Sequence, residues 1–474
     1  MKLRIAIVVV LMGICFTNAQ QKKWTLKECV EYAIENNITI KQSELDLENS
    51  KINKSDAVGS FLPTLNGNAS HSFNIGLSQD VTTGTLQNLT SQNTSGGLSL
   101  GVDIFRGLQN INQLRRSKLA LIASQYRLDN IKDDISLAVA NNYLQVLFNR
   151  ESLIVAQAQY AVTEQDLKRT KELVESGVVP KGDLLEIEAT AATQEQQIIN
   201  ADNALRLSKI ALAQLLLITD YENFDVANED FLVPTSTVMQ NSPRTIFDKA
   251  LTFRNDIKLS KTNVELAEID LKLAKGARLP TISGFYNYDT RASDQDRAVF
   301  LGTEPGNPIG TVASTGETVI GISPILGSRG PDPFTRQLAR NDGHRFGVSL
   351  NVPILNGFSA RNNVKRRRID IERSKNQYEQ DKLDLENVVN QAWNDTQAAL
   401  KTYEAAQKTY VARNEAYNYA RERFNVGLMN SFDFSQAQSR LENAEAEQIR
   451  TKFDYIFKLK ILEFYFGIPI YDLN

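Results

Sequence analysis

The sequence predicts a mainly α-helical protein with a small β-strand contribution, in which one structural unit occurs twice. Two long stretches, 108–176 and 358–426, contain neither glycine nor proline. Four shorter stretches alternate apolar residues with small or polar ones. Similar glycine-containing segments recur at an offset of 250 residues. These observations predict long helical hairpins, four β-strands per chain and an internal duplication.

The duplication rests on pairs of matching segments. The segment LSLGVDIFRGLQN around Gly107 matches VSLNVPILNGFSA around Gly357, and a second pair surrounds Gly177 and Gly427. Upstream, the segment GSFLPT resembles GARLPT at an offset of 217 residues, so the second copy carries 33 additional residues. Register shared over this length indicates tandem copies of one unit.

The N-terminus has the layout of a secretory signal peptide over residues 1–19. Lys2 and Arg4 precede an apolar run that is too short to span a bilayer, and small residues follow it. Cys15 follows Ile14 rather than a small residue, so we do not expect lipidation. Cleavage leaves Cys29 as the single cysteine, and no intramolecular disulfide is then possible.

Each copy is predicted to contain a helix, a β-hairpin, a very long helix and a return helix. In the first repeat, 20–220, these elements occupy 26–58, 61–105, 108–176 and 183–216. A linker over 221–243 leads to the second repeat, 244–474, where they occupy 245–275, 279–355, 358–426 and 433–466. Residues 291–340 are rich in Gly, Pro, Ser, Thr and Asp, which predicts a long exposed loop.

The returning strands of both hairpins alternate in a period of two, which is typical of a strand with one apolar face. We expect this face to contact lipid. Its apolar residues are Leu98, Leu100, Val102 and Ile104 in the first repeat and Phe346, Val348, Leu350 and Val352 in the second.

The long helices carry a heptad pattern, which predicts coiled-coil packing of rods about 100 Å long. In the first repeat the pattern runs through Val139, Val146, Leu153, Tyr160, Leu167 and Val174.

Four strands cannot close a barrel, and open strand edges in lipid would leave backbone groups without partners. An exported chain without a stretch of eighteen apolar residues is periplasmic, secreted or embedded as strands. If the strands face lipid, the chain must therefore oligomerise. Two chains would give eight strands with a filled interior, whereas three give twelve strands around a lumen.

The order of these features resembles the TolC-type outer membrane efflux proteins over essentially the whole mature chain. The resemblance implies a homotrimer with a twelve-stranded barrel in the outer membrane, continued by a periplasmic α-barrel. It also implies a passive exit duct for efflux or type I secretion. Its partners would be a periplasmic adaptor (membrane fusion protein), an inner-membrane pump or ABC translocase, and outer-membrane lipid.

The resemblance also points to residues at the helix-hairpin tips. An aspartate that begins the return helix lies at the family's periplasmic constriction, and Asp433 matches that position; Asp183 is its counterpart in the first repeat. Gln436 stands where a second aspartate is expected, and Phe424 matches an aromatic residue of the constriction. The alternative is that Asp183 and Asp433 cap the return helices.

The turns themselves are apolar and are predicted to dock the adaptor, because an apolar tip exposed to water needs a partner. Ordinary turn chemistry, with glycine at a helix C-terminus, is the alternative. The tip residues are Gly177, Val178, Val179 and Pro180 in the first repeat and Gly427, Leu428 and Met429 in the second.

Other classes of function find little support. The net charge of −3 argues against a nucleic-acid partner. Only His71 and His344 are histidines, and no metal, phosphate-loop or nucleophile motif is present, so we predict no enzymatic activity, cofactor or metal. Basic residues near the strand-to-helix junctions, such as Arg116 and Arg366, fit a solvated helix face or a lipid headgroup contact. A soluble periplasmic tether or adaptor remains the main alternative, and a secreted binding protein is a second.

Overall fold

The computed structural model describes residues 22–79, 85–228 and 236–470, so the predicted signal peptide lies outside the described residues. A mainly helical chain is confirmed. The first repeat contains β1 (Lys23–Trp24), α2 (Leu26–Asn36), α3 (Ile38–Gly59), β2 (Thr64–Gln79), β3 (Leu86–Arg106), α4 (Gln109–Glu175) and α5 (Lys181–Leu215). Between the repeats lie β4 (Asp225–Val226) and the 3₁₀ turn η1 (Thr237–Gln240). The second repeat contains α6 (Pro243–Phe253), α7 (Asn255–Gly276), β5 (Thr281–Ser293), β6 (Arg297–Thr311), β7 (Thr318–Arg329), α8 (Phe334–Arg340), β8 (Gly343–Asn351), α9 (Ser359–Asn425) and α10 (Ser431–Phe466).

Two compact units make up the chain, and each takes segments from both repeats. The helical unit comprises Met1–Lys51, Leu119–Ala267 and Asp370–Asn474. The sheet unit comprises Ile52–Lys118 and Glu268–Ile369. The compact units therefore cut across the two sequence repeats. Among the described residues, no helix combines the length and the apolar character that crossing a membrane requires.

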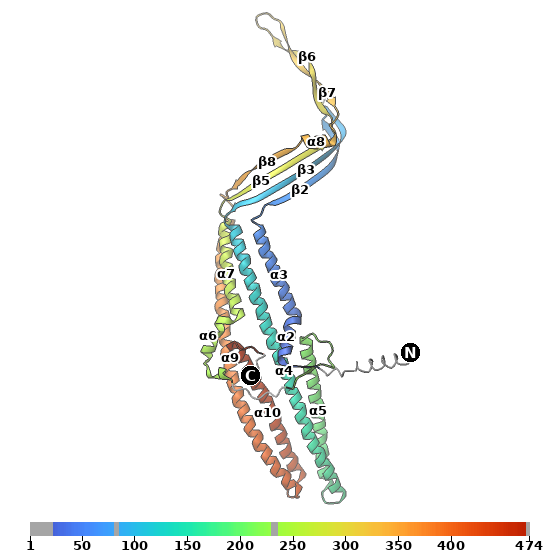
Figure 1. The fold of residues 1–474 in the computed structure, drawn as a ribbon, viewed down its shortest axis with the longest axis vertical. Helices are drawn as coiled ribbons and strands as arrows, with labels where there is room; N and C mark the ends of the chain where they lie inside the picture. The colour runs from blue at the N-terminus through green and yellow to red at the C-terminus, as the bar shows by residue number, and fades with distance from the viewer. Residues whose placement is uncertain (1–21, 80–84, 229–235, 471–474) are drawn as a thin grey trace, which may run out of the picture. The chain divides into compact units, whose positions relative to one another are not determined.

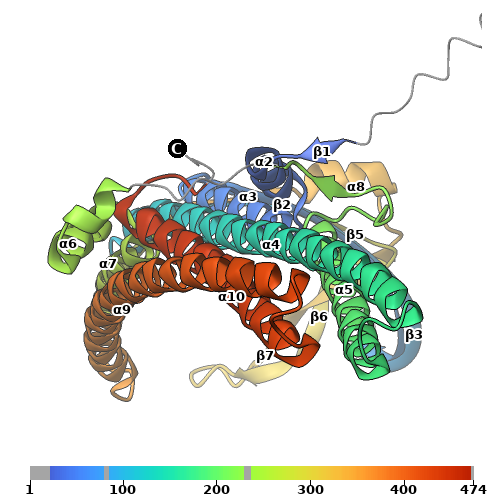
Figure 2. The ribbon, with the colours of Figure 1, turned by 90° about the horizontal axis from the view of Figure 1, so that it is seen from below.

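The core of the helical unit lies where α4 packs against α2, α5 and α10. Val139 and Val146, two heptad positions of α4, are fully buried there beside Tyr143. Leu212 of α5 and Ile456 of α10 are also fully buried in this cluster. Figure 2 shows α10 lying beside α4 and α9. The core thus joins helices of the first repeat to a helix of the second.

The first helix of each repeat is broken once, which corrects the prediction of continuous helices over 26–58 and 245–275. Asn37 separates α2 from α3 with φ −59° and ψ 131°, and Arg254 separates α6 from α7 with φ −57° and ψ 128°. The Asn37 side chain accepts a hydrogen bond from the backbone N–H of Thr39 at 2.9 Å. Arg254 is bound to Asp256 at 2.7 Å. The Asn37 side chain thus bonds to the backbone and offers it an alternative to the helix, whereas the Arg254–Asp256 contact joins two side chains.

In the sheet unit, four antiparallel strands lie side by side in the order β2-β3-β5-β8 (Figure 1). Each repeat supplies one hairpin, β2–β3 and β5–β8. The two hairpins join along β3 and β5, where Leu98 is opposite Tyr288 and Leu100 is opposite Tyr286. This seam is a pairing between repeats that no local pattern specifies.

The prediction of a long loop over 291–340 is wrong, because most of this segment forms regular secondary structure. It forms a two-stranded ribbon, β6–β7, followed by the short helix α8 (Figure 1). Five of its seven glycines lie in the two strands, and Gly316 and Gly330 lie outside them. At Gly327 an added Cβ would lie 2.5 Å from Leu301, and at Gly321 it would lie 2.9 Å from Ile309. Each glycine therefore leaves room for a large neighbouring side chain. Gln337 of α8 binds the backbone of Ser293 at the end of β5.

Candidate pore, docking and membrane-facing sites

The two helix-hairpin tips have the same backbone geometry. Gly177 and Gly427 both have φ +74°, the left-handed region that favours glycine. The N–H of Val178 donates to the carbonyl of Leu173 at 2.9 Å, and the N–H of Leu428 donates to that of Arg423 at 2.8 Å. These are the hydrogen bonds of a Schellman C-cap, which satisfies the last carbonyls of each long helix.

Apolar side chains remain in contact with solvent at both tips. Val178 is 68% exposed and its counterpart Leu428 is 69% exposed. Val179 and Met429 are half-buried, whereas Pro180 is exposed. Turn chemistry explains the glycines but gives no reason for an exposed valine and an exposed leucine in the turns.

The capping role considered for Asp183 and Asp433 is wrong. The N-cap residues are Pro180, which has no side-chain cap bond, and Asn430, whose side chain accepts from the N–H of Asp433 at 2.7 Å. Both aspartates lie in the first turn, where a negative charge is favoured by the helix dipole. Asp183 accepts a hydrogen bond from Ser431 of α10, and exposed Asp433 accepts one from the side chain of Asn430 at 3.0 Å.

Phe424 and Gln436, the other two residues expected at a constriction, lie in different surroundings. Phe424 stacks on Phe434 of α10 with ring centroids 4.5 Å apart, and Tyr417 stacks on the same ring at 5.7 Å. Phe424 therefore packs inside its own hairpin. Gln436 is exposed and accepts a hydrogen bond from Arg440 at 3.1 Å.

The sequence did not predict the polar contacts between the two helical hairpins. The hydroxyls of Thr190 in α5 and Ser435 in α10 are 3.1 Å apart, and Gln194 of α5 donates to Glu442 of α10. Gln438 of α10 donates to Thr163 of α4 at 2.6 Å. The heptad pattern marks the apolar side of each helix, so it gave no signal for polar pairs between return helices.

Two carboxyl groups are half-buried among these contacts. Burial raises the pKa of Asp166, and the opposing effects of Arg169 and Arg421 are smaller. Among the described residues, Oδ2 of Asp166 is buried without a hydrogen-bond partner. Burial also raises the pKa of Glu442, although Gln194 and Gln438 donate hydrogen bonds that lower it. Both groups bind a proton more readily in the folded protein than in the unfolded chain.

This arrangement makes the stability of the helical unit pH-dependent. A carboxyl whose folded-state pKa is raised binds more protons folded than unfolded, so it adds stability as the pH falls through that pKa. Replacing Asp166→Asn and Glu442→Gln together is expected to abolish this gain. The measurement is the melting temperature of the native protein and of the double variant at several pH values between 7.5 and 5.

The matched control for this experiment is Glu188→Gln, because Glu188 is exposed on α5. It removes one carboxylate from the same helical unit without touching the buried pair. An equal response to pH in the native protein and the double variant would contradict the role assigned to the two carboxyl groups.

The residues predicted to face lipid share one face of the sheet. Directly opposed residues of paired strands point to the same side. Leu98 is opposite Tyr288. Gly284 of β5 is opposite Val348 on one neighbouring strand and opposite Val102 on the other, so these residues share a face. The other face is polar, with Asn66 opposite Ser99 and Ser283 opposite Ser349.

Two of the predicted strand residues deviate from regular strand geometry. Ile104 lies in a bulge, where the register shifts between Asp103 and Phe105. Its side chain still reaches the position above Gly284, on the apolar face. Val352 lies one residue beyond the end of β8, so its assignment to the strand is corrected.

Near the strand-to-helix junction, Arg116 of α4 binds Asp270 of α7 at 2.6 Å. This ion pair supports a helix face with acidic neighbours rather than a dedicated headgroup site.

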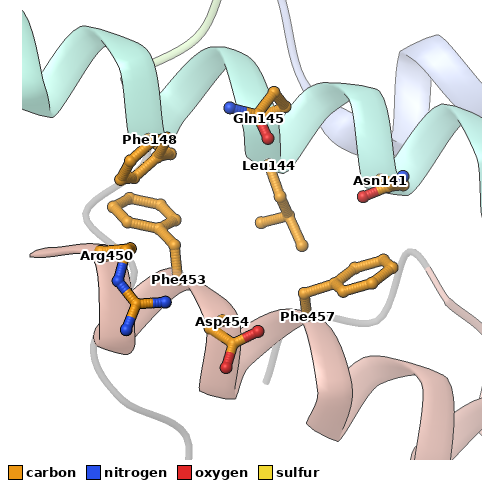
Figure 3. Close-up of a pocket in the computed structure, with 8 residues that line it drawn as sticks. All are labelled: Asn141, Leu144, Gln145, Phe148, Arg450, Phe453, Asp454 and Phe457. Atoms are coloured by element: carbon orange, nitrogen blue, oxygen red, sulfur yellow. The ribbon is translucent and has the colours of Figure 1, made fainter. Parts of the chain in front are cut away.

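A groove lies between α4 and α10, but it has no features of a binding site (Figure 3). Phe148 and Phe453 face each other there at 6.0 Å. Of its polar residues, Arg450 is bound to Glu447 and Asp454 to Lys458, both within α10. The groove is therefore a packing seam between helices. Within the part of the chain that the structure describes, no cluster of three potential metal ligands occurs.

Comparison with known proteins identifies the chain. A family model described as outer membrane efflux protein matches residues 29–216 and 246–464, which includes both repeats and well over half of the chain. The chain belongs to this family. As an outer membrane efflux protein, it supplies the exit duct of an efflux system and resides in the outer membrane, with its helical part in the periplasm. This membership disfavours the soluble tether or adaptor.

Solved structures show the same fold at low sequence identity. The outer membrane protein VceC from Vibrio cholerae is 14% identical, with a TM-score of 0.72 over 94% of this chain and 96% of that chain. The CmeC outer membrane channel of Campylobacter jejuni is 17% identical, with a TM-score of 0.68 over 93% and 85%. The open-state MtrE outer membrane channel of Neisseria gonorrhoeae is 17% identical, with a TM-score of 0.67 over 94% and 89%. Among curated protein sequences, no significant match was found.

Proposed function

We propose that three copies of this efflux protein form one passive conduit across the outer membrane. The observation that carries the proposal is the four-stranded sheet with one apolar face, one polar face and two open edges. Three such sheets supply twelve strands, enough to enclose a water-filled lumen. The apolar face would contact lipid and the polar face would line the lumen, as in outer-membrane barrels.

The hairpin tips are proposed to dock a periplasmic adaptor. Val178 and Leu428 present apolar side chains at equivalent positions of two equivalent turns, so one chain offers two similar contacts. Through the adaptor the conduit would receive cargo from an inner-membrane pump or an ABC translocase. Passage is passive in this proposal, and the chain itself catalyses no reaction.

A constriction at the tips is proposed to depend on charge rather than on aromatic side chains. Asp433 is exposed in the first turn of α10, and a threefold axis would bring three copies of it together. A ring of carboxylates favours cations. Phe424 is a weaker candidate, because its ring is stacked within its own hairpin. The exposed amide of Gln436 and the half-buried carboxylate of Asp183 would line the approach.

The test is the mass and conductance of the native particle. The protein is extracted from outer membranes in detergent, weighed by native mass spectrometry and inserted into planar bilayers. We expect the mass of three mature chains and a cation-selective conductance whose selectivity decreases in Asp433→Asn. A periplasmic monomer without conductance would overturn the conduit. A conducting trimer with unchanged selectivity in Asp433→Asn would overturn only the charged constriction.

A further inference from the structure

The outer end of the four-stranded sheet differs in charge between the two hairpins. All four strands join helices at one end of the sheet, and because the helical part lies in the periplasm, the opposite end is the outer end. Residues 61–105 contain no lysine or arginine, whereas residues 279–355 contain six arginines and no lysine. All six lie in 291–297 and 329–345, where the β6–β7 ribbon begins and ends, together with four aspartates. Positive charge is therefore in excess at this end of the second hairpin.

The short helix α8 is bound to the last residues of β5, beyond the end of the β5–β8 pairing. This pairing ends at Asp289. The hydroxyl of Thr290 donates to the carbonyl of Leu338 at 2.7 Å, and the side-chain amide of Asn341 donates to the carbonyl of Arg291 at 2.7 Å. α8 therefore occupies the place beside β5 that β8 leaves open.

Aromatic side chains on the apolar face show the level at which α8 lies. Tyr286 is opposite Phe346, and Tyr288 is opposite His344. The hydroxyl of Tyr286 is 2.8 Å from Nδ1 of His344. Such aromatic girdles mark the boundary between the apolar band of a barrel and the lipid headgroups. Thr290, which binds α8, follows Tyr288 on the same face about 7 Å further along the strand, so α8 is at the level of the outer headgroups.

Three arginines surround one carboxylate next to α8. The carboxylate of Asp332 lies 3.5 Å from the guanidinium group of Arg297 and 3.6 Å from that of Arg340. The guanidinium group of Arg329 is 4.0 Å away. The Asp332 side chain is 13% exposed, whereas the three arginine side chains are 48–72% exposed. One carboxylate neutralises one guanidinium group, so two positive charges remain close together.

Arg336 adds a fourth guanidinium group. It is exposed on α8 four residues before Arg340, so both side chains lie on one side of the helix. Within the part of the chain that the structure describes, Arg336 takes part in no ion pair. The four residues Arg297, Arg329, Arg336 and Arg340 form the arginine cluster.

Two further aspartates are close to Arg297 in the sequence, but both are bound elsewhere. Asp294 accepts a hydrogen bond from the backbone N–H of Gln92 at 2.7 Å, and Asp296 accepts one from the hydroxyl of Ser328. Among the described residues, neither forms an ion pair with the arginine cluster. The cluster therefore keeps its excess of positive charge.

The use of arginine and the space beside it indicate the kind of ligand. A planar guanidinium group donates two parallel hydrogen bonds to a phosphate, whereas a lysine acts as a point charge. A polar cavity of about 450 Å³ adjoins Arg297 and is also lined by Asp296, Gln337 and Asn341. This lining suits the hydroxyl and phosphate oxygens of a headgroup better than an acyl chain, because buried polar groups need hydrogen-bond partners.

We propose that the arginine cluster binds the phosphate groups of an anionic lipid in the outer leaflet. The inference rests on the proposed contact of the apolar face with lipid. The acyl chains would lie along that face on the membrane side of Tyr288, and the headgroup would reach the cluster beside α8. Because the first hairpin contains no basic residue, each chain offers one such site.

Native mass spectrometry of the delipidated trimer in detergent tests the site. The probe is lipid A, a phosphorylated glycolipid, and it is compared with the same lipid after enzymatic removal of its phosphates. We expect one bound lipid per chain and a Kd at least about tenfold higher for the dephosphorylated form, which corresponds to about 1.4 kcal/mol. Arg340→Gln and Arg336→Gln should each raise the Kd for intact lipid A at least about fivefold.

The matched control is Arg345→Gln. Arg345 lies at the same end of the sheet, but it is opposite Asn287 on the polar face. Its replacement removes the same charge away from the cluster and should leave the Kd unchanged. An equal loss of affinity in this variant would show attraction by net charge alone and would overturn the site.

The remaining outcomes separate the lipid site from the trimer. Equal affinity for both forms of the lipid, or an unchanged Kd in either cluster variant, would overturn the site and leave the trimer intact. Complete displacement by inorganic phosphate at the concentration of the lipid would assign the cluster to the free ion and overturn the lipid. A monomeric mass would overturn the proposed function itself.

Discussion

Val348→Arg is expected to remove the protein from the outer membrane, whereas Ser349→Arg is expected to leave it there. Val348 is 67% exposed on the apolar face of β8. An arginine on the lipid face of a barrel costs about 2–4 kcal/mol near the middle of the bilayer. In a trimer that cost would occur three times. Fractionation of outer membranes, followed by quantification of the protein, measures the loss.

Ser349 is the matched control because it is adjacent in sequence and lies on the opposite, polar face. An arginine there would reach a water-filled lumen at little cost. Val102→Arg, in the equivalent strand of the first repeat, should reproduce the effect of Val348→Arg. Equal membrane levels of Val348→Arg and Ser349→Arg would mean that the apolar face does not contact lipid.

Val178→Asp combined with Leu428→Asp is expected to abolish efflux while the trimer stays in the membrane. The two side chains are apolar and about two-thirds exposed at equivalent positions of the two turns, Val178 at 68% and Leu428 at 69%. If both are anchor residues of a docking surface, each charge would cost about 2 kcal/mol, which is roughly thirtyfold in affinity. The readout is cellular accumulation of the compound that rises most when the native gene is deleted.

The control for the tip variant is Ser439→Asp, which adds one carboxylate at an exposed position of α10 away from the turn. Particle mass and membrane level should match the native protein in both variants. Normal efflux by the double tip variant would show that the apolar turns do not carry the docking.

Much of the candidate site was accessible from the sequence, because turns and faces are local properties. The glycines of the tips and the apolar residues beside them follow from short patterns. The helix caps could not be predicted from the sequence. Asn430 and Asp433 are both good cap residues, and only the backbone shows which one precedes the helix. The packing of Phe424 on Phe434 was also inaccessible, since both residues fit either a lumen or a core.

The segment 291–340 shows where composition misleads. Glycine and proline usually indicate loops, and here they lie in a ribbon. Gly327 and Gly321 make room for Leu301 and Ile309 of the opposite strand. Such pairing is visible only when both strands are in place.

The sequence by itself determined the duplication, the two long helices, the equivalent turns and the two-faced strands. Each of these depends on periodicity or on a residue's own backbone preferences, which act over a few neighbours. Only the tertiary structure decided the strand order β2-β3-β5-β8, the register of the β3–β5 seam and the polar contacts between α5 and α10. The β3–β5 seam joins residues 175 to 200 positions apart, and the contact of Thr190 with Ser435 joins residues 245 positions apart. Packing and backbone pairing in three dimensions determine which residues are partners, and a local sequence pattern does not specify them.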